Sequence, residues 1–178
     1  MQLLSYTPNP EFLIAAAAKL CYSKSGATDL MNGLTEEKVD AFINKIVSMG
    51  HHSPLEHVSF TFAIEGISRT LSHQLVRHRI ASYSQQSQRY VEASDFEYII
   101  PDTISENPAA KAIFEDMMFK IKVAYSSLLA LDIPAEDARS VLANATETKI
   151  VVTMNARTLL HYFEERCCNR AQIGRAHV

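Results

Sequence analysis

The stretch from His57 to Gly66, HVSFTFAIEG, alternates polar and apolar side chains over most of its length. The polar members are His57, Ser59 and Thr61, and the apolar members are Val58, Phe60, Phe62 and Ile64. A period of two places the two sets on opposite faces of an extended strand. Because a strand needs neighbours to pair its backbone N–H and C=O groups, this stretch predicts that the fold contains a sheet.

Three further segments have the composition or the spacing of strands. They are residues 2–8 (QLLSYTP), 96–101 (FEYIIP) and 146–156 (TETKIVVTMNA). The first is predicted to end at Pro8, because proline cannot donate to a sheet ladder. The third has β-branched residues from Ile150 to Thr153, which are enriched in strands.

Helical patterns separate these strands. They cover residues 9–22, 34–50, 67–79, 109–131, 134–143 and 156–168. Asn9 is predicted to cap the first helix, with Pro10 at its first position, and Thr35 to cap the second, which Gly50 ends. Few of the strands look like parallel neighbours joined by a helix. The order therefore predicts an α+β fold with a small, mostly antiparallel sheet and flanking helices, rather than a doubly wound sheet.

Composition limits the function classes. A chain of 178 residues with 47% hydrophobic and 21% charged residues fits one soluble domain. A net charge of −3 argues against a general nucleic-acid binder but leaves room for a local site for a small anion. The three cysteines, of which Cys167 and Cys168 are adjacent, form neither a disulfide framework nor a zinc pattern. With neither a signal peptide nor a transmembrane run apparent, the expected location is the cytoplasm, away from membranes.

Residues 51–57, HHSPLEH, invite a metal interpretation because they contain three histidines and Glu56. The spacing matches neither HExxH nor HxxEH, and Pro54 interrupts the helix that such motifs need. Two alternatives stay open. One is a turn whose histidines are hydrogen-bond partners, and the other is a loop in which His51 and Ser53 contact a cofactor.

Residues 77–90, RHRIASYSQQSQRY, concentrate three arginines, a histidine and several hydroxyl and amide side chains without any acid or lysine. On a helix continuing from Ile67, Gln74, Arg77 and His78 would share one face, and residues 82–89 would form a polar loop. Arginine forks beside serine and glutamine suit a phosphate or a heterocycle. The equally weighted alternative is a solvated face with ion pairs to Asp95 and Glu97.

A third group lies in residues 154–172, MNARTLLHYFEERCCNRAQ. Asn155 and Arg166 are eleven residues apart, about three helical turns, and so lie along one side of the predicted helix. Arg157 and His161 form an i,i+4 pair beside that side. Arg166 follows two glutamates, and its alternative role is that of an exposed, ion-paired arginine of little energetic weight. Arg139 has the same ambiguity.

Together these segments resemble the flavin-dependent thymidylate synthases. Residues 77–89 match the family pattern RHRxxSxxxxSxR at Arg77, His78, Arg79, Ser82, Ser87 and Arg89. Residues 51–62 resemble the family's preceding loop and strand, and residues 155–166 with Ala171 and Gln172 resemble its late helix. The resemblance spans the chain from the first strand to Gln172, so it implies the fold of that family.

The resemblance implies reductive methylation of dUMP to dTMP, with FAD as the hydride carrier and with NADPH and methylenetetrahydrofolate as co-substrates. The implied FAD-binding residues are Ser53, Arg77, His78, Arg79, Gln85, Asn155, Arg157 and His161. The implied dUMP-binding residues are Gln74, Arg77, Gln85, Gln86, Ser87, Gln88, Arg89, Arg139 and Arg166. The implied assembly is a homotetramer with shared active sites.

Two roles are hypotheses within that resemblance. Arg166 is expected to be catalytic, because a cation near the pyrimidine favours negative charge on its N3/O2 side. Ser87 is expected to bind and polarise uracil or its phosphate rather than to act as a nucleophile, since no base is paired with it in sequence.

The last residues, 173–178 (IGRAHV), follow a long helix abruptly and add no apolar face. The family continues after Ala-Gln with Trp-Glu and further helix, so residues 1–172 are expected to be an incomplete domain and 173–178 a non-native tail. Two other functions remain open: a non-catalytic nucleotide- or RNA-binding module, and an inactive fragment.

Overall fold

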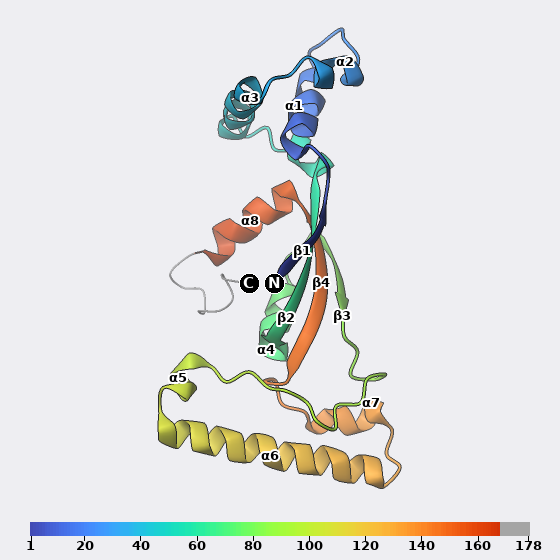
Figure 1. Ribbon diagram of the computed structural model, residues 1–178, viewed down its shortest axis with the longest axis vertical. Coiled ribbons are helices and arrows are strands. Elements are labelled where there is room, and N and C mark those ends of the chain that lie inside the picture. The colour runs from blue at the N-terminus through green and yellow to red at the C-terminus, as the bar shows by residue number, and fades with distance from the viewer. Residues whose placement is uncertain (168–178) are drawn as a thin grey trace. The chain divides into compact units, whose positions relative to one another are not determined.

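The computed structural model describes residues 1–167 and is drawn in Figure 1. Its strands are β1 (Gln2–Tyr6), β2 (Ser59–Ser68), β3 (Ala81–Gln85) and β4 (Glu147–Asn155). They form one small antiparallel sheet in the order β1-β2-β4-β3. The helices are α1 (Pro10–Leu20), α2 (Ala27–Asn32), α3 (Glu36–Ser48), α4 (Arg69–Leu75), α5 (Asp102–Ser105), α6 (Pro108–Ala130), α7 (Ala135–Ala138) and α8 (Ala156–Arg166), with 3₁₀ turns η1 (Ser53–His57) and η2 (Arg139–Val141). This confirms the predicted α+β class.

The strands predicted at 2–8, 57–66 and 146–156 are confirmed, but residues 96–101 do not form one. Tyr98 makes only an isolated bridge to Thr146. The chain turns into α5 directly after Pro101, and proline lacks the N–H with which a strand would continue.

The helix boundaries are close to the predicted ones, while the caps differ. Asn9 precedes α1 in a left-handed conformation, with φ of 50°, and its side chain makes no capping hydrogen bond. Thr35 stands at the N-cap of α3, also without a capping bond. Gly50 ends that region with φ of 78°, a conformation that glycine adopts without steric cost. The predicted helix 134–143 is divided into α7 and η2.

The described chain divides into two compact units, with β2, β3 and β4 each contributing residues to both. The first unit contains Met1–Ala63, His78–Ser82 and the chain from Val152 onward. Its core gathers α1, α3 and η1 around a cluster of buried side chains: Ile14, Ala18, Ile46, Leu55 and Val58. Ala156 packs on this core, and its backbone N–H donates to the Val58 carbonyl at 2.9 Å, so the core positions the start of α8.

The second unit contains Ile64–Arg77 and Tyr83–Val151. Its longest helix, α6, packs against α5, α7 and η2. Tyr125 of α6 is 0% exposed, and its hydroxyl accepts a hydrogen bond from the Ala93 backbone N–H at 3.2 Å. That bond fixes the segment that follows β3 against α6.

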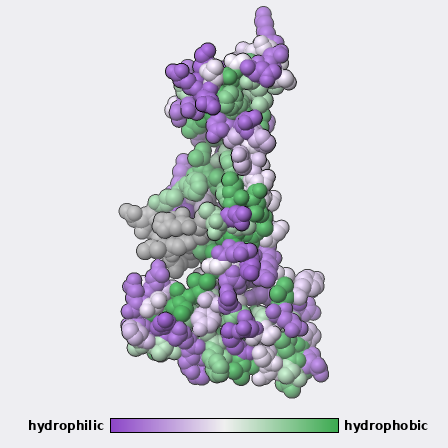
Figure 2. All heavy atoms as spheres, in the orientation of Figure 1, coloured by the Kyte–Doolittle hydropathy of each residue, from purple (hydrophilic) through white to green (hydrophobic). Residues whose placement is uncertain are grey.

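Several large apolar side chains remain on the surface, where Figure 2 shows hydrophobic residues among the polar ones. Among the described residues, no helix combines the length and the apolar character needed to cross a membrane.

Candidate functional site

The arginine-rich segment departs from the predicted helix-and-loop arrangement. Helix α4 ends at Leu75, so the expectation that Gln74, Arg77 and His78 share one helical face is wrong. Gln74 lies in the last turn of α4, whereas Arg77 and His78 follow its end. The chain turns here to pair β3 with the sheet, and this tertiary pairing overrides the local helical pattern.

Residues 81–85 form strand β3 and not the predicted loop. The odd-numbered residues of β3 are half-buried and the even-numbered ones exposed, as the two-residue period requires. Two of the inward side chains, Tyr83 and Gln85, are polar, and both form hydrogen bonds. Tyr83 Oη donates to the Leu75 carbonyl at 3.0 Å. Gln85 Nε2 contacts Ser72 Oγ at 2.8 Å and Thr148 Oγ1 at 3.1 Å.

Gln85 therefore ties the start of the candidate substrate segment to α4 and β4. Ser72 and Thr148 are buried, so the amide of Gln85 satisfies two hydroxyl groups away from water. The Gln86 backbone N–H donates to the Lys149 carbonyl at 2.9 Å and continues the attachment to β4. The residues after β3 thus leave the sheet from a fixed position.

A cavity of about 430 Å³ lies beside this segment in the second unit. Its lining includes three of the predicted dUMP-binding residues, Gln86, Ser87 and Gln88. Four carboxylates also line it: Glu92, Asp95, Glu97 and Glu147. Because carboxylates repel a phosphate, the cavity suits the neutral part of a ligand better than its anionic group.

The arginines near this segment have partners that the sequence did not suggest. Arg89 Nη2 lies 3.0 Å from Glu136 Oε2, and Arg89 Nε donates to the same oxygen at 3.1 Å. Arg139 Nε donates to the Glu136 carbonyl at 2.9 Å. Asp95, the expected partner, is paired instead with Lys122 at 2.7 Å. Two predicted dUMP-binding arginines therefore contact Glu136, Arg89 through its carboxylate and Arg139 through its backbone carbonyl, and the Arg89 N–H donates to Ser87 Oγ.

A second group of predicted residues lies in the first unit, along α8. The ring of His78 packs edge-on against Tyr162, with ring centroids 4.8 Å apart. Burial and the positive charge of Arg166 lower the pKa of His78, and Glu165 opposes this shift. Burial raises the pKa of Tyr162. The surroundings of His78 thus favour the neutral form of its ring.

Three further predicted FAD-binding residues lie at the N-terminal end of α8 and in the turn η1: Asn155, Arg157 and Ser53. Asn155 caps α8, because its Oδ1 accepts the Thr158 N–H at 2.8 Å. Arg157 in the first turn forms an ion pair with Glu56 of η1. Ser53 begins η1, which packs against α8. Residues 53–57 thus form a 3₁₀ turn before the strand, and His52 precedes it as the N-cap.

The predicted site residues therefore fall into two sets. The first unit holds Ser53, His78, Arg79, Asn155, Arg157, His161 and Arg166, and the second unit holds Gln74, Arg77, Gln85, Gln86, Ser87, Gln88, Arg89 and Arg139. With the exceptions of Arg77, Gln85 and Arg166, this division separates the residues predicted for FAD from those predicted for dUMP. Within each unit, packing and hydrogen bonds bring members of the set together.

Sequence reasoning missed three residues that hold these groups in place. Glu136 pairs with Arg89, Glu56 pairs with Arg157, and Tyr162 packs on His78. Each partner is distant in sequence, so no local motif could have identified it.

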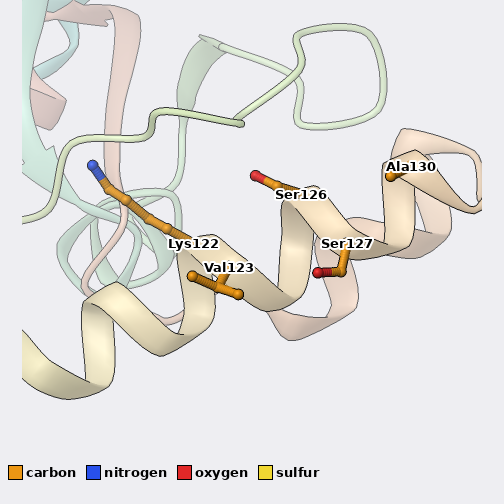
Figure 3. A pocket seen from close by; sticks show the side chains of 5 residues that line it. All are labelled: Lys122, Val123, Ser126, Ser127 and Ala130. Atoms are coloured by element: carbon orange, nitrogen blue, oxygen red, sulfur yellow. The ribbon is translucent and has the colours of Figure 1, made fainter.

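A shallow hollow of about 370 Å³ lies on α6, lined by Lys122, Val123, Ser126, Ser127 and Ala130 (Figure 3). None of the predicted site residues lines it, and it is separate from the candidate site. In the described part of the chain, no three side chains of His, Cys, Asp or Glu gather as metal ligands.

Comparison with known proteins gives consistent matches over the chain. Residues 2–174 match the family model described as thymidylate synthase complementing protein. The flavin-dependent thymidylate synthase of Geobacter sulfurreducens is 55% identical over 172 residues, covering 96% of this chain and 74% of that protein. That of Clostridium tetani is 52% identical over 188 residues, covering 97% and 76%. That of Nitratidesulfovibrio vulgaris is 54% identical over 185 residues, again covering 97% and 76%.

Proposed function

We propose a reaction for this chain from the premise that it belongs to the family of flavin-dependent thymidylate synthases. It is an enzyme of thymidylate synthesis with a flavin cofactor and dUMP as substrate. In the proposed reaction, dUMP is methylated reductively to dTMP. Methylenetetrahydrofolate donates the one-carbon unit, and NADPH is the reductant.

The contacts of Arg89 and Arg139 with Glu136, together with the bond from the Arg89 N–H to Ser87, are the observation that supports the substrate assignment. A nucleotide phosphate is a dianion, and guanidinium groups bind it through charge-assisted hydrogen bonds. The neighbouring cavity, lined by Gln86, Ser87 and Gln88, offers amide and hydroxyl groups for the sugar and the base. We assign dUMP to this segment together with Gln74, Arg77, Gln85 and Arg166.

The donors of the first unit fit FAD. His78, Arg79 and Arg157 supply cationic or N–H donors suited to a pyrophosphate, and Ser53 adds a hydroxyl. Tyr162 and His78 supply ring faces and edges against which a flat group can pack. We assign FAD to these residues with Asn155 and His161, and to Arg77 and Gln85 from the second unit. Bound and reduced FAD would supply the hydride for the reaction.

The protein's own contribution is to bind and orient the flat reactants and to stabilise charge. Arg166 lies at the end of α8, where its charge already acts on His78. We propose that the same charge favours negative charge on the N3/O2 side of uracil, which makes C5 a better nucleophile.

Ser87 is proposed to bind the substrate and not to attack it. Its Oγ accepts a hydrogen bond from the Arg89 backbone N–H at 3.2 Å. Within the described residues, no histidine or carboxylate is hydrogen-bonded to it as a general base, which a nucleophilic serine needs.

The assembly and the domain limits are proposals as well. We propose a homotetramer with shared active sites, residues 1–172 as the thymidylate synthase domain, and residues 173–178 as a non-native tail. The tail lies outside the described residues. Shared active sites, in which subunits complete one another, suit a small chain with scattered binding groups.

The first test is the visible absorption spectrum of the gently purified protein, followed by dTMP formation from dUMP, methylenetetrahydrofolate and NADPH. A flavin spectrum that changes on addition of dUMP, together with dTMP formation, is the expected result. A protein that binds flavin and dUMP but forms no dTMP with NADPH would contradict the proposed reductant. A protein that binds neither would contradict the site assignment.

A further inference from the structure

Arg69 is a half-buried arginine that lies outside the RHRxxSxxxxSxR pattern. It is the first residue of α4, and its backbone N–H donates to the Thr146 carbonyl at 2.9 Å. Its Nη1 donates to the Gln86 carbonyl at 3.4 Å. The side chain of Arg69 therefore lies against the backbone of the substrate segment, one residue before Ser87.

Among the described residues, not every arginine near this segment is ion-paired with a carboxylate. Of Arg69, Arg89 and Arg139, only Arg89 forms an ion pair with a carboxylate of the described residues, that of Glu136. Arg69 and Arg139 donate to backbone carbonyl oxygens, which accept a hydrogen bond without neutralising the charge. Burial and the nearby charge of Arg139 both lower the pKa of Arg69. Both arginines are half-buried, and the charge of Arg139 acts on Arg69, so an anion bound near them would offset this repulsion.

We propose that Arg69 is a further phosphate-binding residue of the dUMP site, acting with Arg89 and Arg139. The proposal rests on the proposed function of this site. A phosphate dianion bound near Ser87, outside the carboxylate-lined cavity, would offset the charge of the arginines and could accept bonds from three guanidinium groups. The part of dUMP that Arg69 recognises is then the phosphate and not the base. Arg69 selects the nucleotide over the nucleoside.

The test compares binding of dUMP and of deoxyuridine to the FAD-loaded enzyme by equilibrium dialysis. In Arg69→Gln, we expect dUMP to bind about 10- to 100-fold more weakly, the loss typical of a charge-assisted hydrogen bond, and deoxyuridine to bind as in the wild type. In Arg69→Lys, which keeps the charge but loses the planar fork, we expect a smaller loss. Lys120→Gln removes a cation from the exposed face of α6 and is the matched control.

The outcomes separate this inference from the proposed function. If the wild type shows no preference for dUMP over deoxyuridine, the substrate assignment itself is wrong, and this proposal falls with it. If the wild type prefers dUMP and Arg69→Gln keeps the full preference, only the role of Arg69 is wrong. Equal weakening of both ligands would mean that Arg69 merely supports the segment through Gln86. If Arg69→Gln does not fold, Arg69→Lys provides the test. An unchanged preference of that variant for dUMP over deoxyuridine would contradict a role for the planar guanidinium group of Arg69 in binding the phosphate.

Discussion

At the residue scale, the protonation of His78 is opposed by its surroundings. Burial and the charge of Arg166 lower its pKa in the folded protein, while the unfolded chain binds the proton near the ordinary pKa of about 6.5. The stabilising effect of a neutral His78 is therefore complete above pH 6.5 and is lost as the pH falls from there through the lower folded pKa. We predict that the free energy of unfolding decreases as the pH falls from about 6.5 through the lower folded pKa of His78.

The direct measurement is an NMR titration of the His78 ring in folded protein and in urea. The folded ring should titrate at lower pH than the unfolded one, and Arg166→Gln should move the folded pKa upward because it removes a neighbouring positive charge. Equal midpoints in the folded and unfolded protein would contradict the predicted environment.

Tyr125 gives a second prediction at this scale, one about stability. Tyr125→Phe keeps the buried ring but leaves the Ala93 N–H without its acceptor. An unpaired, partly buried donor costs about 1–3 kcal/mol in the free energy of unfolding, which chemical denaturation would measure. Tyr22→Phe, at a side chain that is 89% exposed, is the control and should change stability little. Equal effects of the two variants would show that the bond to Ala93 contributes nothing.

The sequence singled out candidate site residues but could not indicate their partners. The fixed spacing of residues 77–89 marked Ser87 and Arg89, since a motif is local in the chain. The carboxylate that pairs with Arg89 is Glu136, which is 47 residues away, whereas the nearby Asp95 looked suitable and is not used. Charge pairing across the fold depends on which elements pack together, and no periodicity encodes that.

At the scale of elements, long apolar patterns predicted the bounds of helices correctly. The prediction failed where hydrogen bonds between polar side chains determine which element forms. Helix α6 follows its predicted limits within one residue at each end. The predicted helix 67–79 is longer than α4, and β3 lies largely in residues that were predicted to form a loop. The inward side chains of β3 include Tyr83 and Gln85, whose hydrogen bonds to α4 and β4 replace the apolar face that normally marks a strand.

The capping of α8 provides a prediction for this scale. Asn155 Oδ1 accepts the Thr158 N–H at 2.8 Å, so Asn155→Ala should lower the free energy of unfolding of the flavin-free protein by about 0.5–2 kcal/mol. Thr35→Ala is the matched control, because Thr35 occupies an N-cap position without a capping bond. Its effect should be clearly smaller in the same denaturation experiment. A control loss as large as that of Asn155→Ala would mean that the cap is not the cause.

At the scale of the whole molecule, one face of the β1–β2 pair carries apolar side chains that are partly exposed among the described residues. Leu3 lies opposite Phe62 and Tyr6 opposite Phe60, so these four side chains share one face. The rings of Tyr6, Phe60 and Phe62 stack along it, with centroids 6.4 and 6.5 Å apart. Leu3 is 46% and Tyr6 53% exposed, although burying such groups is a main source of stability.

A second copy of the chain is the cover that the proposed homotetramer supplies. Contiguous exposed apolar patches of this kind mark interaction surfaces, and an edge strand such as β1 gains most from being covered. We predict that light scattering of the eluting protein gives a mass of about 80 kDa, four copies of the 19.9 kDa chain. Leu3→Glu should yield smaller, folded species, because a charge on this face opposes burial. Gln2→Glu adds the same charge on the opposite face of β1 and should leave the mass unchanged. If Leu3→Glu also remained tetrameric, the subunits would have to meet elsewhere on the chain.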